Sequence, residues 1–298
     1  MSWYKEYKNQ WKEIIETIAS EEHRTTQMIE KDIIQSMILL GLSKSKISFV
    51  FKGGTSLSKC YGLIERFSED IDLSLNYKPT ESEKREIKTI IIETAKNIGL
   101  NLTNSDDVKS RYNYNKYVFE YESLFYEIPL ELIVETSFYQ TVYPVKIHTV
   151  DSFVGKFCIN RNVELPIPFE ASSVNILVQS LERTFIDKVF AVCDYKIQNM
   201  QDRDSRHLYD IAKIMPEIKI NEDLKGLIRE VRMDRMKSKN NPSAQPKYNI
   251  SKMLEEIIES RFYETDYNNI TKRLLYEDFS YEKAIEKGIS KVVEMDIF

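Results

Sequence analysis

The N-terminal part of the chain repeats its hydrophobic residues every three or four positions. The first such set is Trp11, Ile14, Ile15 and Ile18. This spacing places apolar side chains on one face of a helix. The pattern continues to Gly41, a residue type that commonly ends helices. We therefore predict helices across residues 3–41.

Beyond residue 41 the apolar runs become shorter. Short runs rich in β-branched and aromatic residues, separated by turn residues, are typical of strands. Strands are predicted at 47–51, 70–75 and 130–138, with further β-like pieces within 112–126. Helices are predicted at 55–64 and 79–98, the second ending before Gly99.

The remainder of the chain is mostly helical in its periodicity from Ile176 onward. Irregular connections are predicted at 144–159, 166–168 and 238–248, where prolines interrupt the pattern. We place the domain boundary near the first two. The predicted fold class is α+β, with a small mixed sheet flanked by helices in residues 1–160 and a mainly helical domain in residues 161–298.

Composition narrows the class of protein. The 298 residues are 42% hydrophobic and 30% charged, with a net charge of −5, so no global basic field attracts nucleic acid. The cysteines, Cys60, Cys158 and Cys193, show neither zinc nor disulfide spacing. The N-terminus lacks a signal-peptide core, and no apolar run approaches the roughly 20 residues that span a membrane. We therefore predict a cytoplasmic protein without a membrane partner.

Two aspartates one residue apart dominate the predicted strand 70–75. Asp70 and Asp72 alternate with Ile71 and Leu73, so both carboxylates point to one face of the strand. Like charges side by side repel each other unless a cation lies between them. Carboxylate oxygens are ligands for Mg²⁺. The pair therefore predicts a divalent metal site, and the alternative is a solvated strand face.

Paired glycines precede these aspartates in a chain that has only 8 glycines. Gly53 and Gly54 follow the strand 47–51, and Thr55 begins the next predicted helix. Glycines let the backbone approach a ligand closely, and the free N–H groups at a helix start bind anions. The turn predicts a phosphate site with a hydroxyl from Thr55 or Ser56. The alternative is a tight turn without a ligand.

A third acid would complete a two-metal site. Glu131 and Glu135 share one face of the predicted strand 130–138, because they are four residues apart. Glu135 is the preferred candidate and Glu131 the runner-up. The alternative for both is a plain surface position.

The string Phe-Lys-Gly-Gly-Thr-Ser-Leu-Ser-Lys…Arg-Phe-Ser-Glu-Asp-Ile-Asp-Leu, within residues 51–73, resembles the AbiEii/AbiGii nucleotidyltransferase toxin family. That family belongs to the polymerase-β-like nucleotidyltransferase superfamily. Two later stretches, 183–191 and 205–211, resemble it as well, so the ordered matches span residues 48–211. The sequence departs from the generic superfamily pattern in the long separation between Thr55 and the aspartate pair, which suits the toxin family. Another departure is that a threonine replaces the usual serine.

The resemblance implies a polymerase-β-like nucleotidyltransferase domain, and it assigns roles to individual residues. Asp70 and Asp72 would hold Mg²⁺ or Mn²⁺ on the triphosphate of a nucleotide. Lys188 would contact the triphosphate, and Asp210 would act as a base or orient Lys188. Nucleotide-binding residues would be Gly53, Gly54, Thr55, Ser56, Lys59 and Arg66. Neighbours supporting Asp210 would be Arg206 and His207. Without the resemblance, Lys188 would be read as part of a solvated helix face. Asp210, Arg206 and His207 would be read as partners in salt bridges across a pair of helices.

The function implied by the resemblance is transfer of a nucleoside monophosphate from a nucleoside triphosphate to an RNA acceptor, with tRNA as the first candidate. Family members act as toxins of type IV toxin–antitoxin or abortive-infection systems, with a separately encoded antitoxin. Two alternatives stay open: transfer to a protein hydroxyl, and a non-catalytic nucleotide-binding regulator. Residues 225–252 hold eight cations and two acids. This basic helix and loop suit an RNA backbone, and the alternative is a solvated helix face.

Overall fold

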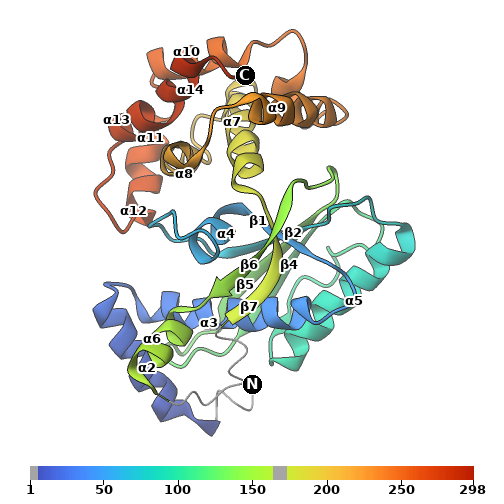
Figure 1. Cartoon of the computed structure of the whole chain (residues 1–298). Helices are drawn as coiled ribbons and strands as arrows, with labels where there is room; N and C mark the ends of the chain where they lie inside the picture. The colour runs from blue at the N-terminus through green and yellow to red at the C-terminus, as the bar shows by residue number, and fades with distance from the viewer. Residues whose placement is uncertain (1–5, 164–172) are drawn as a thin grey trace. The chain divides into compact units, whose positions relative to one another are not determined.

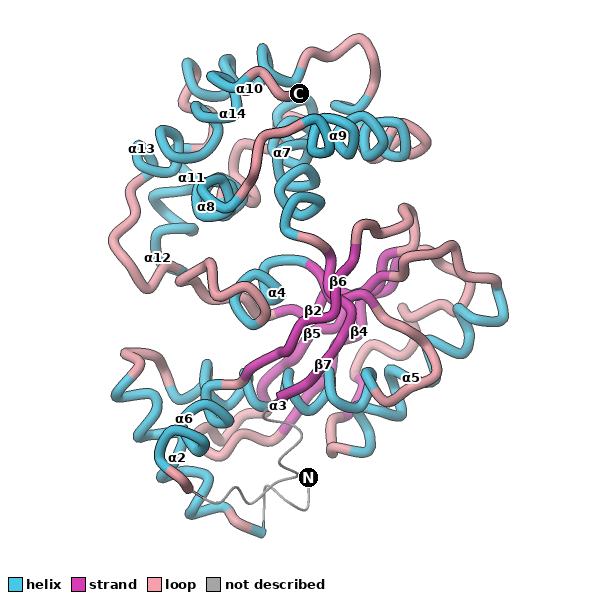
Figure 2. Tube along the Cα trace, viewed as in Figure 1, coloured by secondary structure: helices cyan, strands magenta, loops and turns pink. Residues whose placement is uncertain are grey.

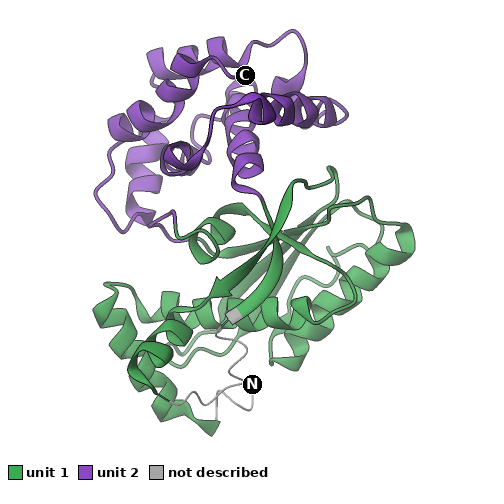
Figure 3. Cartoon of the chain, in the orientation of Figure 1, with its two compact units in different colours: residues 1–62, 68–179 green, residues 63–67, 180–298 purple. Residues whose placement is uncertain are grey.

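The computed structural model describes residues 6–163 and 173–298. The chain divides into two compact units, shown in different colours in Figure 3. Unit 1 comprises residues 1–62 and 68–179, and unit 2 comprises residues 63–67 and 180–298. The boundary predicted after residue 160 therefore precedes the division between Gln179 and Ser180. The predicted connection at 166–168 and the start of the first predicted helix lie outside the described residues.

Unit 1 is built on a mixed sheet of seven strands in the part of the chain that is described, drawn in magenta in Figure 2. The strands are β1 (Val50–Lys52), β2 (Asp70–Ser74), β3 (Asn101–Leu102), β4 (Tyr114–Tyr121), β5 (Leu130–Ser137), β6 (Val145–Asp151) and β7 (Ser173–Gln179). Their order across the sheet is β3-β4-β5-β2-β1-β7-β6. The pairs β2–β5 and β1–β7 are parallel, and the other neighbours are antiparallel.

One face of this sheet is apolar, because side chains alternate along each strand. Ile71, Tyr117 and Val134 point into the core of unit 1 and are at most 1% exposed. The helices α3 (Thr26–Ser43) and α5 (Glu81–Asn97) run along this face in Figure 1 and contribute to the same core. Covering one face leaves the alternate residues of β2, β4 and β5 for polar chemistry on the other.

The residue type of Gly41 predicted the end of a helix, but the structure has no helix end at this position. After α2 (Lys8–Glu21), α3 continues through Gly41 to Ser43. A Cβ atom at this glycine would lie 2.4 Å from Thr94 Cγ2 in α5. The glycine therefore allows α3 and α5 to pack closely, which is a tertiary requirement that local stop signals do not distinguish from a helix end.

The region predicted to be irregular after residue 144 is structured. Residues 145–151 form β6, and α6 (Phe153–Arg161) follows it with a Ser152 side-chain cap. β6 is an edge strand with Ile147 73% exposed, so its pattern lacks the clean alternation of a half-buried strand. The predicted helical region also begins too early, because residues 173–179 form β7 beside β1.

Unit 2 is mainly helical. Its helices of eight or more residues, within the described residues, are α7 (Leu181–Ile197), α8 (Arg206–Ile214), α9 (Glu222–Arg235) and α10 (Ile250–Glu259). Shorter helical pieces are η2 (Met215–Glu217), η3 (Pro242–Ala244), α11 (Glu264–Asp266), η4 (Tyr267–Thr271), α12 (Lys272–Leu274), α13 (Tyr281–Ala284), η5 (Ile285–Ile289) and α14 (Ser290–Met295). The described helices include none with the length and apolarity needed to cross a membrane.

The short segment 63–67 belongs to unit 2 although it lies between α4 (Gly53–Lys59) and β2 in the sequence. Arg66 forms an isolated antiparallel bridge with Leu275. The Phe67 N–H donates to the Leu274 carbonyl at 2.9 Å, and the Tyr276 N–H donates to the Glu65 carbonyl at 2.8 Å. These backbone bonds fix Arg66 within unit 2.

Candidate active site

A row of charged residues crosses four strands of the unit 1 sheet. The register pairs Lys52 with Asp72, Asp72 with Glu135, and Glu135 with Lys116. Residues directly opposite each other on neighbouring strands share one face of a sheet. Asp70 lies on this face as well, two residues before Asp72. The structure therefore brings the three sequence-predicted acids onto one face, with a lysine at each end of the row.

Gly53 makes room for the Asp72 carboxylate. Its φ of +79° lies in the left-handed region that favours glycine. A Cβ atom built at Gly53 would lie 1.9 Å from Asp72 Oδ2, far inside van der Waals contact. The first glycine of the pair is therefore required by the position of the aspartate, in addition to any role in binding phosphate.

Tyr114 is a neighbour of the acids that the sequence did not single out. Its side chain lies close enough to Glu135 for each to influence the other's pKa, and it is 40% exposed. Burial, together with the negative charges of Glu135 and Asp72, raises the pKa of Tyr114. Burial and the nearby Asp72 charge also raise the pKa of Glu135, which the nearby Tyr114 hydroxyl partly offsets. Glu135 is thus a carboxylate with an enhanced affinity for a proton.

The residues present suit a magnesium ion bound jointly with a nucleotide. Among the described residues, no three His, Cys, Asp or Glu side chains form a ready-made metal cluster. Mg²⁺ commonly takes one or two carboxylates from the protein and completes its shell with water and phosphate oxygens. Asp70 and Asp72 offer that hard-oxygen pair, and the absence of a Cβ at Gly53 leaves room for the Asp72 carboxylate.

Thr55 and Ser56 face the protein rather than projecting outward. The Thr55 hydroxyl donates to the Asp70 carbonyl at 2.6 Å, and the Ser56 hydroxyl donates to the Gly53 carbonyl at 2.8 Å. Both side chains are at most 1% exposed. Their hydroxyls therefore stabilise the glycine turn and tie α4 to the start of β2.

Lys59 has a buried acid as its partner. Its ammonium donates to Asp32 Oδ1 at 2.5 Å, to the Asp32 carbonyl at 3.1 Å and to Ser36 Oγ at 3.1 Å. An ammonium group has three donors, so protein oxygens occupy all of them. We therefore assign Lys59 a structural role in joining α4 to α3.

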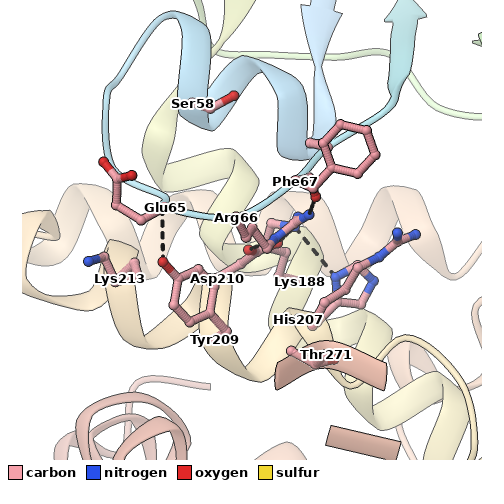
Figure 4. Close-up of polar contacts among 12 residues, drawn as sticks. Ser58, Glu65, Arg66, Phe67, Lys188, His207, Tyr209, Asp210, Lys213 and Thr271 are labelled. Atoms are coloured by element: carbon pink, nitrogen blue, oxygen red, sulfur yellow. Dashed lines mark hydrogen bonds and ion pairs between the residues drawn. The ribbon is translucent and has the colours of Figure 1, made fainter. Parts of the chain in front are cut away.

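Unit 2 contains a second polar cluster, shown in Figure 4. Arg66 Nε and Nη2 donate to the two oxygens of the fully buried Asp210 at 2.7 and 2.8 Å. Lys188 Nζ donates to Asp210 Oδ2 at 2.6 Å. The third guanidinium nitrogen, Arg66 Nη1, donates to the Phe67 carbonyl at 3.0 Å. Asp210 thus joins two cations from distant parts of the sequence.

Burial and charge act in opposite directions in this cluster. Burial alone would raise the pKa of Asp210, but the charges of Arg66 and Lys188 outweigh it and hold the pKa far below its usual range. Burial lowers the pKa of Lys188, and Asp210 offsets part of that effect. An acid with so low a pKa is a poor proton acceptor. The sequence left two roles open for Asp210, a proton acceptor or a group that orients Lys188. The short contacts and the low pKa favour the second.

His207 and Arg206 differ in their relation to the cluster. His207 Nδ1 lies 3.4 Å from Lys188 Nζ, and its ring stacks on Tyr195 with 6.1 Å between centroids. Burial and the Lys188 charge lower the pKa of His207 to about 3, so the ring is neutral and can accept from the ammonium. Arg206 pairs instead with Asp204 at 3.0 Å.

Comparison with known proteins identifies the chain. Residues 38–287 match the family described as "Nucleotidyl transferase AbiEii toxin, Type IV TA system". The chain belongs to the AbiEii nucleotidyltransferase toxin family. It is therefore a nucleotidyltransferase, of the toxin class of type IV toxin–antitoxin systems, as its sequence motifs predicted. A nucleoside triphosphate substrate and an antitoxin follow from that membership.

Solved structures confirm the predicted α+β fold of this AbiEii protein. A proposed nucleotidyltransferase from H. pylori is 17% identical, with a TM-score of 0.53 over 92% of this chain and 97% of that one. The nucleotidyltransferase toxin MenT4 from Mycobacterium tuberculosis is also 17% identical, with a TM-score of 0.51 over 94% of this chain and 88% of that one. No curated protein sequence matches the chain.

Two arginines of the predicted basic surface, residues 225–252, have internal partners, which corrects that prediction. Arg235 is 7% exposed and donates to Asp187 at 3.1 Å and to Asp194 at 2.7 Å. Arg232 donates to three backbone carbonyls of the following loop, those of Ala244, Gln245 and Tyr248. These arginines fasten the loop to the helices of unit 2. The cations that remain exposed in this region are Arg229, Lys237, Lys239, Lys247 and Lys252.

Replacing Gly53 with alanine is expected to lower nucleotide transfer by about 10²-fold, because a displacement of roughly 1 Å at a reacting group costs this much. The added methyl group must push the Asp72 carboxylate away. Transfer rates and thermal stability of the purified variant measure the effect.

Gly62→Ala is the matched control for Gly53→Ala. Gly62 also has a positive φ, +63°, but a Cβ atom there would have nothing within 4 Å. Both variants carry backbone strain of about 1–2 kcal/mol, and only the first moves an acid. Equal activity losses in the two variants would show that strain, rather than contact with Asp72, is responsible.

Proposed function

We propose that this AbiEii toxin transfers a nucleoside monophosphate to an RNA acceptor, using a divalent metal held by Asp70 and Asp72. The observation that carries the proposal is the row of acids on β2 and β5 with Gly53 beside it. The family generally works with divalent metals and nucleoside triphosphates. When bound, Mg²⁺ or Mn²⁺ would neutralise charge on the triphosphate and on departing pyrophosphate.

Glu135 is the proposed proton acceptor for the attacking hydroxyl. A general base works best when its pKa approaches the working pH, and burial together with Asp72 raises the pKa of Glu135 in that direction. The acceptor hydroxyl would lose its proton to Glu135 as its oxygen attacks the α-phosphorus.

Lys188 is the proposed cation for the triphosphate. Its ammonium is held by Asp210 at 2.6 Å, and Arg66 holds the other Asp210 oxygen at 2.7 Å. Because Asp210 is fixed on both sides, Lys188 is presented in one orientation. Such preorganised charge costs no rearrangement when the phosphoryl group is transferred. We assign Arg66 to this support and not to direct contact with the nucleotide.

RNA is the proposed acceptor, with tRNA as the first candidate. The chain has a net charge of −5, yet exposed cations gather locally, both in residues 225–252 and around Lys109 and Arg111. A phosphate backbone is bound by such local clusters.

A labelled-nucleotide assay tests the proposal. The full chain is incubated with each of the four α-labelled triphosphates and with total RNA or total protein extract, in the presence of Mg²⁺ or of a chelator. We expect one triphosphate to label the RNA fraction, and the chelator to abolish labelling. Label in the protein fraction would establish the alternative acceptor, and absence of any pyrophosphate release would favour a non-catalytic regulator.

A further inference from the structure

A basic hollow lies between α5 and the loop that leads into β4. Its volume is about 490 Å³, and its lining includes Lys88, Lys109, Arg111 and Tyr112, with Asp106 as the acid among the lining residues. The cations therefore outnumber the acid three to one in a chain whose overall charge is negative. Lys109, Arg111 and Tyr112 are exposed, and Tyr112 has 58% of its surface in contact with solvent.

The loop around this hollow is held in one conformation by side chains. The amide of Asn115, which is 6% exposed, accepts from the Lys109 N–H at 2.8 Å and donates to the Lys109 carbonyl at 3.1 Å. Lys88 Nζ donates to the Val108 carbonyl at 2.8 Å. A loop fixed in this way loses little conformational entropy when a ligand binds.

The loop that lines the hollow leads directly into β4, whose Lys116 lies opposite Glu135 in the row of charged residues. Tyr114 begins β4, two residues after Tyr112, and lies close enough to Glu135 for that acid's charge to raise its pKa. The Phe138 N–H donates to the Asn113 carbonyl at 2.7 Å, which brings the end of β5 beside the start of β4. Tyr139, which follows that contact, is 54% exposed. Three exposed tyrosines, Tyr112, Tyr114 and Tyr139, therefore lie at or next to the adjoining ends of β4 and β5.

Cations beside exposed aromatic rings are the usual means of binding single-stranded nucleic acid, because phosphates meet the cations and bases stack on the rings. We propose that the β4 surface, defined as Lys88, Lys109, Arg111, Tyr112 and Tyr114, binds the single-stranded 3′ end of the acceptor RNA. The inference rests on the proposed RNA acceptor. It moves the RNA site from the basic region 225–252 to unit 1, where the basic loop runs directly into the strand of Tyr114, close to Glu135.

The test measures RNA binding apart from turnover. The full chain carrying Asp72→Asn is titrated against a fluorescent single-stranded RNA oligonucleotide with a free 3′ hydroxyl, and anisotropy gives Kd at several salt concentrations. We expect Lys109→Glu/Arg111→Glu to raise Kd at least about 10-fold. The slope of log K against log salt should fall by about 1.4, since two phosphate contacts are lost. Tyr112→Ala should raise Kd about 5-fold or more through lost stacking.

Two charge-reversal controls make the result specific. Lys287→Glu/Lys291→Glu makes the same change in net charge as Lys109→Glu/Arg111→Glu, at exposed positions of unit 2. It should change Kd less than about 2-fold, because only the overall charge of the protein is altered. Arg229→Glu/Lys239→Glu tests the competing basic region. An unchanged Kd in the Lys109/Arg111 variant, or a larger loss in the Arg229/Lys239 variant, would overturn the inference.

The outcome is separable from that of the proposed function. If wild-type enzyme labels protein and not RNA, the proposed acceptor is wrong, and the binding titration still decides whether the β4 surface binds RNA. If wild-type enzyme labels RNA while the reversed variant keeps the KM for RNA, the acceptor is right and the surface is wrong. A raised KM for RNA with unchanged kcat and unchanged KM for the triphosphate supports both.

Discussion

Replacing Asp72 with asparagine is expected to lower nucleotide transfer about 10³-fold while leaving the fold intact. Asparagine matches aspartate in shape, so it fits the space beside Gly53 that a Cβ atom would fill. It removes the negative charge that metal binding requires and that raises the pKa of the paired Glu135. Loss of one preorganised electrostatic contact typically costs 10²- to 10³-fold, about 3–4 kcal/mol. Labelled-nucleotide transfer with thermal melting as a folding check measures the effect.

Glu131→Gln provides the matched control for this experiment. Glu131 lies four residues before Glu135 on the same face of β5, and it is exposed. Removing its charge should change transfer less than about 2-fold, as expected for a surface substitution, whereas Glu135→Gln should lower it strongly. A large loss at Glu131 with little loss at Glu135 would exchange the two assignments for the third acid.

Replacing Asp210 with alanine is expected to destabilise the protein by about 3–5 kcal/mol, because it leaves two buried cations without their acid. Arg66 and Lys188 are 4% and 6% exposed, and both donate to the Asp210 carboxylate. Urea unfolding followed by circular dichroism gives the loss. Hydrogen exchange of the α7 and α8 amides locates it. Nucleotide transfer should also fail, since Lys188 loses the group that orients it.

Two controls separate burial from charge at Asp210. Glu294→Ala breaks the exposed pair with Lys291 and should cost no more than about 0.5 kcal/mol. The triple variant Arg66→Met/Lys188→Met/Asp210→Leu replaces the whole buried set with apolar side chains, and it should recover most of the lost stability without recovering transfer. A cost below about 1 kcal/mol for Asp210→Ala would contradict the structure of this cluster.

Local sequence patterns were sufficient for the parts of the site that lie on one element. The alternation around Asp70 and Asp72 predicted β2 and the shared face of the two acids, and the structure has both. The predicted strand 130–138 corresponds to β5, and the predicted helix 79–98 corresponds to α5. In each case the period of the apolar residues is itself the physical cause of the element, because it decides which side chains are buried.

Interactions between distant segments could not be predicted in this way. The pairing of Asp72 with Glu135 depends on the register of a parallel pair, which alternation alone does not fix. Arg66 and Lys59 were grouped with the nucleotide by their place in the motif, but the structure gives them buried acids as partners, Asp210 and Asp32. Arg235 was one of the eight cations in the basic region 225–252, because helical spacing does not show that Asp194 lies beside it.

The segment 63–67 has a consequence for dividing the protein genetically. It lies between two elements of unit 1, yet its backbone bonds to residues 274–276 and its arginine binds Asp210. A gene fragment encoding residues 180–298 would lack Arg66, one of the two cations that pair with the buried Asp210. A fragment ending at residue 179 would carry five residues whose partners are missing. Each unit is made of two separate stretches of sequence. A recombination that exchanges unit 2 must therefore exchange residues 63–67 together with residues 180–298.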